Sequence, residues 1–538
     1  MERFLVWRHI MGTYLNPGAG KLRQSRNSEI YVDKSGMLSY LNHVINTEQR
    51  FVCVSRPRRF GKSMSANLIS AYYDHTVDGR TLFHGMEIES DKSFAKHVSN
   101  YDVIKINMQE FLSNSTDMTM LLTLLKKAIL RDLLREYPDF DYLMPDKLMF
   151  TMQDIYNETQ RQFIIIIDEW DCIFREEKNH KEQQEQYLDF LRDWLKDKEY
   201  IALAYMTGIL PIKKYGTHSA LNMFSEFSML DQGRLAVYTG FTEAEVKALC
   251  ERYNMDFIQT QEWYDGYRLE GCGEVYSPRS VVQSMLMGKF NNYWNQTETF
   301  EALRVYIDMN YDGLRDAILT VMAGGRVEID SRSFVNDMVT FHSADDVLTL
   351  LVHLGYLGYD EPQKEIFVPN KEIMDEFVTA TTRSEWSEVM HSIKKSKALL
   401  KATLAGDETA VAQGIAEAHL ETSHIQYNDE NALSYTLSLA YYAAREHYQM
   451  IRELPTGKGF ANIVFIPKKR FADRPAILVE LKWNHDAQTA ITQIKENHYP
   501  RLLQDLDYKE IILVGVSYDK KNRVHNCRIE QKKLCEKY

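Results

Sequence analysis

Three consecutive residues, Gly61-Lys62-Ser63, have the types and order that phosphate binding requires. A glycine lets the backbone approach a phosphate, a lysine can reach the β and γ oxygens, and a serine hydroxyl can ligate Mg²⁺. An apolar run precedes them and an amphipathic pattern follows, which predicts a strand, a phosphate loop and a helix over residues 50–73. The residues expected to contact the nucleotide are Arg56, Pro57, Arg58, Arg59, Phe60, Gly61, Lys62 and Ser63.

A second group of residues, Phe163 to Trp170, lies farther along the chain. Its four consecutive isoleucines suit a strand buried on both faces of a parallel sheet. Asp168 would end this strand beside the phosphate loop and hold Mg²⁺, and Glu169 would polarise the attacking water. The alternative is a basic turn and an unrelated buried strand that ends in an acid, but both motifs in this order rarely coincide.

Further strands are expected around these two motifs. Tyr101 to Asn107 forms one between them in the sequence, and Tyr200 to Met206 forms another that ends in Thr207-Gly208. The additional strand and Glu169 point to the P-loop NTPases that hydrolyse with a glutamate, which include the AAA-type ATPases. In that branch, a polar residue at the tip of the later strand senses the γ-phosphate. Thr207 is the candidate here, and the alternative is an ordinary strand-ending threonine.

Several elements should cover or complete this site. Helices are expected over residues 36–45, 116–136 and 176–198, and a helical lid over residues 242–280. Arg279 of the lid could complete the nucleotide site or start a helix with a structural partner. Asp33 could pair with a loop arginine or serve as a turn carboxylate. Lys213 and Lys214 could touch phosphate or form a solvated basic turn.

The C-terminal region carries another carboxylate and lysine. Strands are expected over residues 460–466 and 476–481, and helices over residues 431–442 and 487–497. Strand alternation places Glu480 and Lys482 on one face. A carboxylate there can ligate Mg²⁺, and the lysine can activate a water that attacks a phosphodiester. The alternative is a salt bridge on a half-exposed strand.

This second arrangement resembles the PD-(D/E)xK nuclease superfamily. The resemblance implies a metal shared between Glu480 and an acid on the preceding strand, where this chain has Asn462. An amide removes a full negative charge from a site for a hard cation, so we expect weakened cleavage. Gln493, Lys495 and Tyr499 lie where related folds place residues near the site.

Together, residues 55–63, 167–171, 207–208, 264–267 and 480–482 resemble bacterial AAA-ATPase-like proteins with a C-terminal PD-(D/E)xK nuclease-like domain. In that family the arginine-rich phosphate loop is usual, whereas the position of Asn462 more often has aspartate. The resemblance implies ATP and Mg²⁺ as cofactors, and DNA or RNA as a partner of the C-terminal domain. It also implies Lys62, Glu169, Glu480 and Lys482 as catalytic residues.

Composition sets limits on these expectations. The net charge of −12 argues that any nucleic acid would meet a local basic patch. The six cysteines form no C-x-x-C pair, which is typical of reduced cytosolic thiols, and no apolar run is long enough to span a bilayer. We therefore expect a cytoplasmic protein of unspecified oligomeric state. Two alternatives stay open, a nucleotide-gated scaffold without turnover and a protein-interaction regulator.

The 538 residues suggest about three domains. The expected fold class is α/β, with a P-loop NTPase core, a helical lid, a helical or winged-helix-like middle and a C-terminal restriction-endonuclease-like domain. The first ten residues precede Met11, an equally simple start of translation. The expected ranges are an N-terminal extension over 1–28, the ATPase core over 29–235, the lid over 236–300, the middle region over 301–400 and the nuclease-like domain over 401–538.

Overall fold

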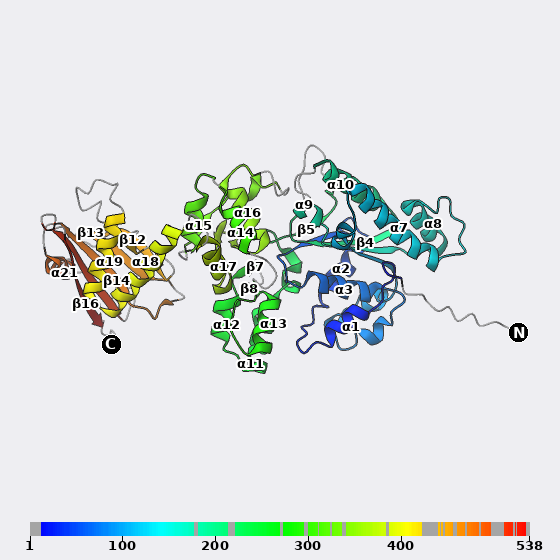
Figure 1. The fold of residues 1–538 in the computed structure, drawn as a ribbon. Coiled ribbons are helices and arrows are strands. Elements are labelled where there is room, and N and C mark those ends of the chain that lie inside the picture. The colour runs from blue at the N-terminus through cyan, green and yellow to red at the C-terminus, as the bar shows by residue number, and fades with distance from the viewer. Residues whose placement is uncertain are drawn as a thin grey trace. The chain divides into compact units, whose positions relative to one another are not determined.

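The protein has an α/β fold that divides into two compact units (Figure 1). The first unit comprises Met1–Thr299, Met309–Leu314 and Glu328–Asp375, and the second comprises Phe300–Asp308, Arg315–Val327 and Glu376–Tyr538. This computed structural model describes residues 12–533, except for 177–180, 213–220, 270–272, 295–299, 310, 323–324, 336–340, 383–386, 422–439, 442, 445–446, 456–459, 469–470, 484–485, 497–509, 520–521 and 523.

A five-stranded parallel sheet forms the centre of the first unit, with the strand order β2-β3-β4-β1-β5. Its strands β1, β3 and β4 are completely buried, which explains their continuous apolar sequences. The strand that lies between β1 and β3 is β4, whereas β2 is at the edge of the sheet. The bounds are β1 Phe51–Ser55, β2 Asp102–Asn107, β3 Phe163–Asp168, β4 Ile201–Gly208 and β5 Ser225–Phe227.

Helices cover both faces of this sheet, with α2 and α3 on one side and α7 and α10 on the other (Figure 1). The apolar stripes of α2 and α3 pack in one core with alternate residues of the strands. The bounds are α1 Gly20–Arg26, α2 Met37–Val44, α3 Lys62–Tyr73, α4 Gly79–Leu82, η1 Glu87–Ser90, α5 Phe94–His97, α6 Met108–Ser113, α7 Met118–Glu136, α8 Leu148–Thr159, α9 Cys172–Glu176 and α10 Lys181–Leu195.

The expected lid contains helices and a small antiparallel sheet of order β6-β8-β7. A capping box of Thr242 and Glu245 starts α11, and Pro278 starts α13. The bounds are η2 Gly233–Tyr238, β6 Phe241–Thr242, α11 Glu243–Tyr253, α12 Phe257–Tyr264, β7 Tyr267–Leu269, β8 Gly273–Tyr276 and α13 Pro278–Met287.

The region expected to be helical or winged-helix-like contains helices and a three-stranded sheet of order β10-β11-β9. Its residues are divided between the two units. The bounds are α14 Phe300–Ile307, α15 Leu314–Met322, β9 Val327–Glu328, η3 Ser331–Ser333, α16 Ala344–Leu354, β10 Gly358–Asp360, β11 Glu365–Phe367 and α17 Lys371–Thr382.

A mixed five-stranded sheet of order β12-β13-β14-β15-β16 dominates the second unit. Only β14 and β15 pair in parallel among its described ladders. One face packs in a core with α18 and α19, and the other packs with α21. The bounds are α18 Ser387–Ala405, α19 Glu408–Glu421, β12 Tyr448–Pro455, β13 Phe460–Pro467, β14 Ala476–Trp483, α21 Ala487–Glu496, β15 Glu510–Asp519 and β16 Val524–Lys533.

The expected helix over residues 431–442 lies almost entirely outside the described residues, and so do residues 1–11. Where the chain is described, no helix has both the length and the apolar character that crossing a membrane requires. Its described cysteines, Cys53, Cys172, Cys250 and Cys527, are free and buried.

Candidate functional site

The phosphate loop, defined here as residues 56–61, connects the end of β1 to the start of α3. The first residue of the loop is attached to the end of β4, because the Arg56 N–H donates to the Gly208 carbonyl over 3.0 Å. Gly61 has a φ of 89°, a left-handed conformation that glycine adopts without steric cost. The same turn therefore delivers the N-terminus of a 12-residue helix, where free N–H groups and the helix dipole favour an anion.

A cavity of about 560 Å³ opens beside this helix start. Basic residues outnumber acidic ones around it, which suits a polyanionic ligand. Apolar side chains supply another part of the wall, which suits a flat ring. The charged lining residues are Glu29, Lys34, Arg58, Arg59, Lys62, Glu169 and Arg279, and the apolar ones include Ile30, Val32, Phe60, Phe241, Val282 and Leu286.

The side chain of Lys62, the first residue of α3, reaches back over the phosphate loop. Its Nζ donates to the carbonyls of Arg56 and Pro57, at 2.9 and 2.8 Å. Burial lowers the pKa of this amine, and the negative charges of Glu169, Asp171 and Asp168 oppose that shift. The amino group thus lies near the acids at the end of β3 and just after it, where it can exchange the two carbonyls for phosphate oxygens.

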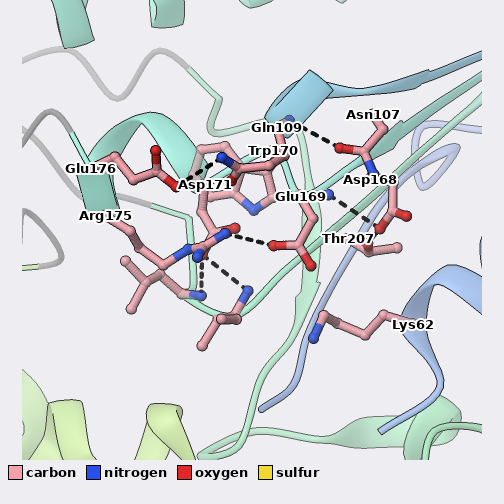
Figure 2. Close-up of polar contacts among 12 residues, drawn as sticks. Lys62, Asn107, Gln109, Asp168, Glu169, Trp170, Asp171, Arg175, Glu176 and Thr207 are labelled. Carbon is pink, nitrogen blue, oxygen red and sulfur yellow. Dashed lines mark hydrogen bonds and ion pairs between the residues drawn. The ribbon is translucent and has the colours of Figure 1, made fainter. Parts of the chain in front are cut away.

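Asp168 and Thr207 meet at the carboxyl edge of the sheet (Figure 2). The Thr207 hydroxyl and the Glu169 N–H both donate to Asp168 Oδ1, the second over 3.2 Å. Asn107 pairs in register with Asp168 on the neighbouring strand, and its Oδ1 accepts from the Gln109 N–H. Three adjacent strand ends therefore present oxygen atoms of the kind that Mg²⁺ prefers.

Glu169 is held by an arginine that sequence reasoning missed (Figure 2). Arg175 Nη2 lies 2.5 Å from Glu169 Oε2, and Arg175 Nε lies 3.2 Å from Asp171 Oδ2. The same Asp171 oxygen accepts from the N–H groups of Ile209 and Leu210, which follow β4. Asp171 therefore connects the chain that follows β4 to Arg175 and, through Arg175, to Glu169.

Two features of Glu169 are typical of a functional position. Its φ is 54°, an uncommon backbone conformation for a residue other than glycine. Burial raises the pKa of its carboxyl group, and the positive charges of Lys62 and Arg175 oppose that effect. The Glu169 carboxylate is thus partly shielded from water where it lines the cavity.

Not every residue expected at the nucleotide lines the cavity. Arg56 is buried behind the loop, where its Nη1 donates to the carbonyls of Ser55 and Phe227, each over 2.9 Å. Burial lowers the pKa of this guanidinium to about 10. Pro57 contacts protein instead, because it packs closely against Gly355. These two side chains hold the loop in place, while Arg58, Arg59, Phe60, Gly61, Lys62 and Ser63 face the cavity.

The remaining expectations around this site have different outcomes. Arg279 lines the cavity near the start of α13. Asp33 accepts from the N–H groups of Ser35 and Glu87, each over 2.8 Å, as a turn carboxylate does. Lys213 and Lys214 lie outside the described residues. The apolar wall at Ile30 and Val32 was not foreseen, because its sequence signal was only an extended segment.

The C-terminal carboxylate and lysine lie together on β14. Lys482 Nζ is 3.7 Å from Glu480 Oε1, and Glu480 is almost fully buried. Both belong to the strand face that packs with α21, since Leu478 of the same alternation lies in that core. Ser517 of β15 pairs in register with Lys482. The expected shared face is therefore present.

The expected partners of Glu480 are only partly described. Asn462 belongs to β13, but its side chain lies outside the described residues, as does Tyr499. Gln493 and Lys495 are on α21, and Lys495 Nζ lies 2.6 Å from Glu530 Oε2. Where the structure is described, no group of three or more His, Cys, Asp or Glu residues could hold a metal ion. The expected sites have one carboxylate each, so they do not depend on such a group.

Comparison with known proteins identifies two segments. Residues 21–217 match the family model of a predicted AAA-ATPase, and residues 430–527 match that of the PD-(D/E)XK nuclease superfamily. No curated protein matches the chain. A solved structure of the Aeropyrum pernix ORC2 protein in ADPNP-ADP complexes aligns with 66% of this chain and 98% of that chain, at 11% identity and a TM-score of 0.30. That likeness is too low to carry an inference.

Proposed function

Because this chain joins an AAA-ATPase-like domain over residues 21–217 to a PD-(D/E)XK nuclease-superfamily domain over residues 430–527, we propose that it binds and hydrolyses ATP. The C-terminal domain would engage DNA or RNA in response. The observation that supports the first half best is the cavity between the start of α3 and the acid that follows β3, since it contains both Lys62 and Glu169.

Several polar groups in and near this cavity have distinct roles in the proposal. Lys62 and the N–H groups of residues 58–63 bind the phosphates, and Arg279 approaches them from the lid. Glu169 accepts the proton of the attacking water, and Thr207 holds Asp168 in orientation. Ser63 and Asp168 would bind Mg²⁺, which when bound neutralises phosphate charge. The apolar wall at Ile30, Val32 and Phe241 accommodates the base.

The test of the ATPase uses two substitutions with different expected results. Lys62→Ala should weaken ATP binding, because it removes the cation closest to the helix start. Glu169→Gln should bind ATP normally and lose turnover by about 100-fold or more, since an amide cannot accept the proton. Lys127→Ala, on the exposed side of α7, is the matched control.

Nucleotide binding is measured by calorimetry and turnover by phosphate release. Turnover that neither Lys62→Ala nor Glu169→Gln reduces would refute these roles. Tight binding without turnover in the wild type would support the alternative of a nucleotide-gated scaffold. Measurement with and without DNA then asks whether nucleic acid stimulates hydrolysis.

For the C-terminal domain we propose a weakened metal-dependent nuclease site. Glu480 would bind the metal and Lys482 would activate water. The proposal is supported by the pairing of Ile463 with Val479, because Asn462 and Glu480 are the next residues of these two strands. The metal would thus find an amide where a second carboxylate would bind it more strongly.

Asn462→Asp should increase Mg²⁺-dependent cleavage of DNA or RNA, because it restores a negative charge at that position. The double variant Asn462→Asp with Lys482→Ala should lose the gain. Strong cleavage by the wild type that disappears in Lys482→Ala would show that Asn462 does not weaken the site. Failure of every variant to bind nucleic acid at low salt would favour the protein-interaction regulator.

A further inference from the structure

A buried carboxylate outside the cavity connects three separate segments of the first unit. Glu372 is the second residue of α17 and is 1% exposed. Its Oε1 accepts from the N–H groups of Tyr293 and Trp294, at 2.6 and 2.9 Å. Its Oε2 accepts from the Ser280 hydroxyl over 2.8 Å. An acid in the first turn is favourable for its own helix, but these bonds all go to other elements.

Two of these contacts, those with Ser280 and Tyr293, lead to arginines that line the nucleotide cavity. Ser280 follows Arg279 directly on α13. The Tyr293 carbonyl accepts from Arg59 Nη1 over 2.5 Å, and Arg59 belongs to the phosphate loop. The carboxylate therefore fixes the backbone that carries Arg279 and the carbonyl that anchors Arg59.

Other contacts place the segments near Glu372 against the phosphate loop. A side chain at Gly355, the residue after α16, would lie 2.7 Å from Pro57 and 2.9 Å from Trp294. The Gly355 carbonyl accepts from the Tyr267 hydroxyl over 2.7 Å, and the Tyr267 ring packs edge-on against Phe60, with centroids 5.1 Å apart. Pro57 and Phe60 of this loop thus pack toward the end of α16 and the lid.

We propose that Glu372 is a positioning residue for the nucleotide site, through which ATP binding and the start of α17 stabilise each other. The inference rests on the proposed binding of ATP in this cavity. Phosphates that draw in Arg59 and Arg279 would tighten both of the segments that Glu372 holds. By linkage, a partner that binds α17 and displaces it must weaken ATP binding, and ATP must weaken the binding of that partner by the same factor.

The sharpest test compares two serines of one helix. Ser280→Ala removes the hydroxyl that donates to Glu372 and lies 3.4 Å from Ser277 Oγ, whereas Ser284→Ala removes a buried hydroxyl that donates to Val281 O within α13 and also interacts with Tyr264. We expect Ser280→Ala to weaken ATP binding about 5- to 20-fold and to reduce the ATP-induced protection of α17 from hydrogen exchange. Ser284→Ala should leave both at wild-type values.

Substitutions of the carboxylate itself provide a second measurement. Glu372→Ala leaves two N–H groups and a hydroxyl without their acceptor, so it should reduce affinity more than Ser280→Ala. Glu372→Gln keeps an oxygen for the N–H groups and an amide for the serine, so it should restore most of the binding. Thermal unfolding shows which variants are folded. If Glu372→Ala does not fold, the result for Ser280→Ala tests the proposed role of Glu372.

Wild-type affinity and wild-type α17 protection in folded Ser280→Ala would overturn the inference. So would ATP binding by the wild type that protects the phosphate loop but leaves α17 unchanged, and this result would not affect the proposed ATPase. No ATP binding by the wild type would overturn both.

Discussion

At the scale of single residues, the orientation of Glu169 depends on its neighbours. A glutamate serves as a base only while its carboxylate points at the water, and a free side chain samples several rotamers. Here Arg175 restrains one oxygen, and Asp171 restrains Arg175 in turn (Figure 2). Because Asp171 also binds the chain after β4, the restraint is built on two strands of the sheet.

Arg175→Ala should therefore slow ATP turnover by about 10- to 100-fold while the affinity for ATP changes little. Arg175→Lys should restore part of the rate, since an ammonium can still pair with the carboxylate. Steady-state kinetics with a separate binding titration distinguishes the two effects. Arg192→Ala is the control, because Arg192 pairs with Asp189 on the outer surface of α10. Equal loss of affinity and rate would assign Arg175 a structural role only.

At the scale of elements, the sequence predicted those whose signal is local. β1, β3 and β4 are buried apolar runs, and α3 and α7 have helical periodicity, so each was expected near its observed position. β12, β15 and β16 were not predicted, although β15 is almost wholly buried. The position of β4 between β1 and β3 depends on pairing between strands that are distant in the sequence, and a local sequence pattern does not specify that pairing.

The same distinction applies to the candidate site. Lys62 and Asp168 could be proposed because each belongs to a short motif with its own chemistry. Arg175 and Glu372 could not, because their meaning depends on partners from other elements. Arg175 does follow Asp171 by four residues on a short helix, a spacing that permits an ion pair. That spacing is too common to identify a site by itself.

The packing of α21 on the C-terminal sheet gives a prediction at this scale. A Cβ at Gly515 would lie 2.4 Å from the Ala487 carbonyl oxygen and 3.0 Å from the Ile491 side chain. Gly515→Ala should thus push α21 outward and destabilise the second unit by about 1–3 kcal/mol. Gly20→Ala, where the new methyl group meets no atom within 4 Å, is the control. Hydrogen exchange of β15 and α21 provides the measurement, and unchanged protection in Gly515→Ala would contradict the close packing.

At the scale of the whole molecule, the two units are interleaved in sequence. Phe300–Asp308 and Arg315–Val327 belong to the second unit, although residues of the first unit follow them. A fragment of residues 401–538 would lack helices that its unit contains. Experiments on either activity are therefore best made on the full chain.

A ligand that binds in the first unit should stabilise that unit more than the C-terminal sheet. We expect two thermal transitions, of which saturating Mg²⁺-ATP raises one, because ligation adds about 2.7 kcal/mol at a concentration 100 times the Kd. Hydrogen exchange assigns each transition, and protection should grow over β1, β3 and α3 but not over β13 and β14. Lys62→Ala should remove the shift. If both transitions rise together, nucleotide binding is transmitted to the C-terminal sheet through the fold itself.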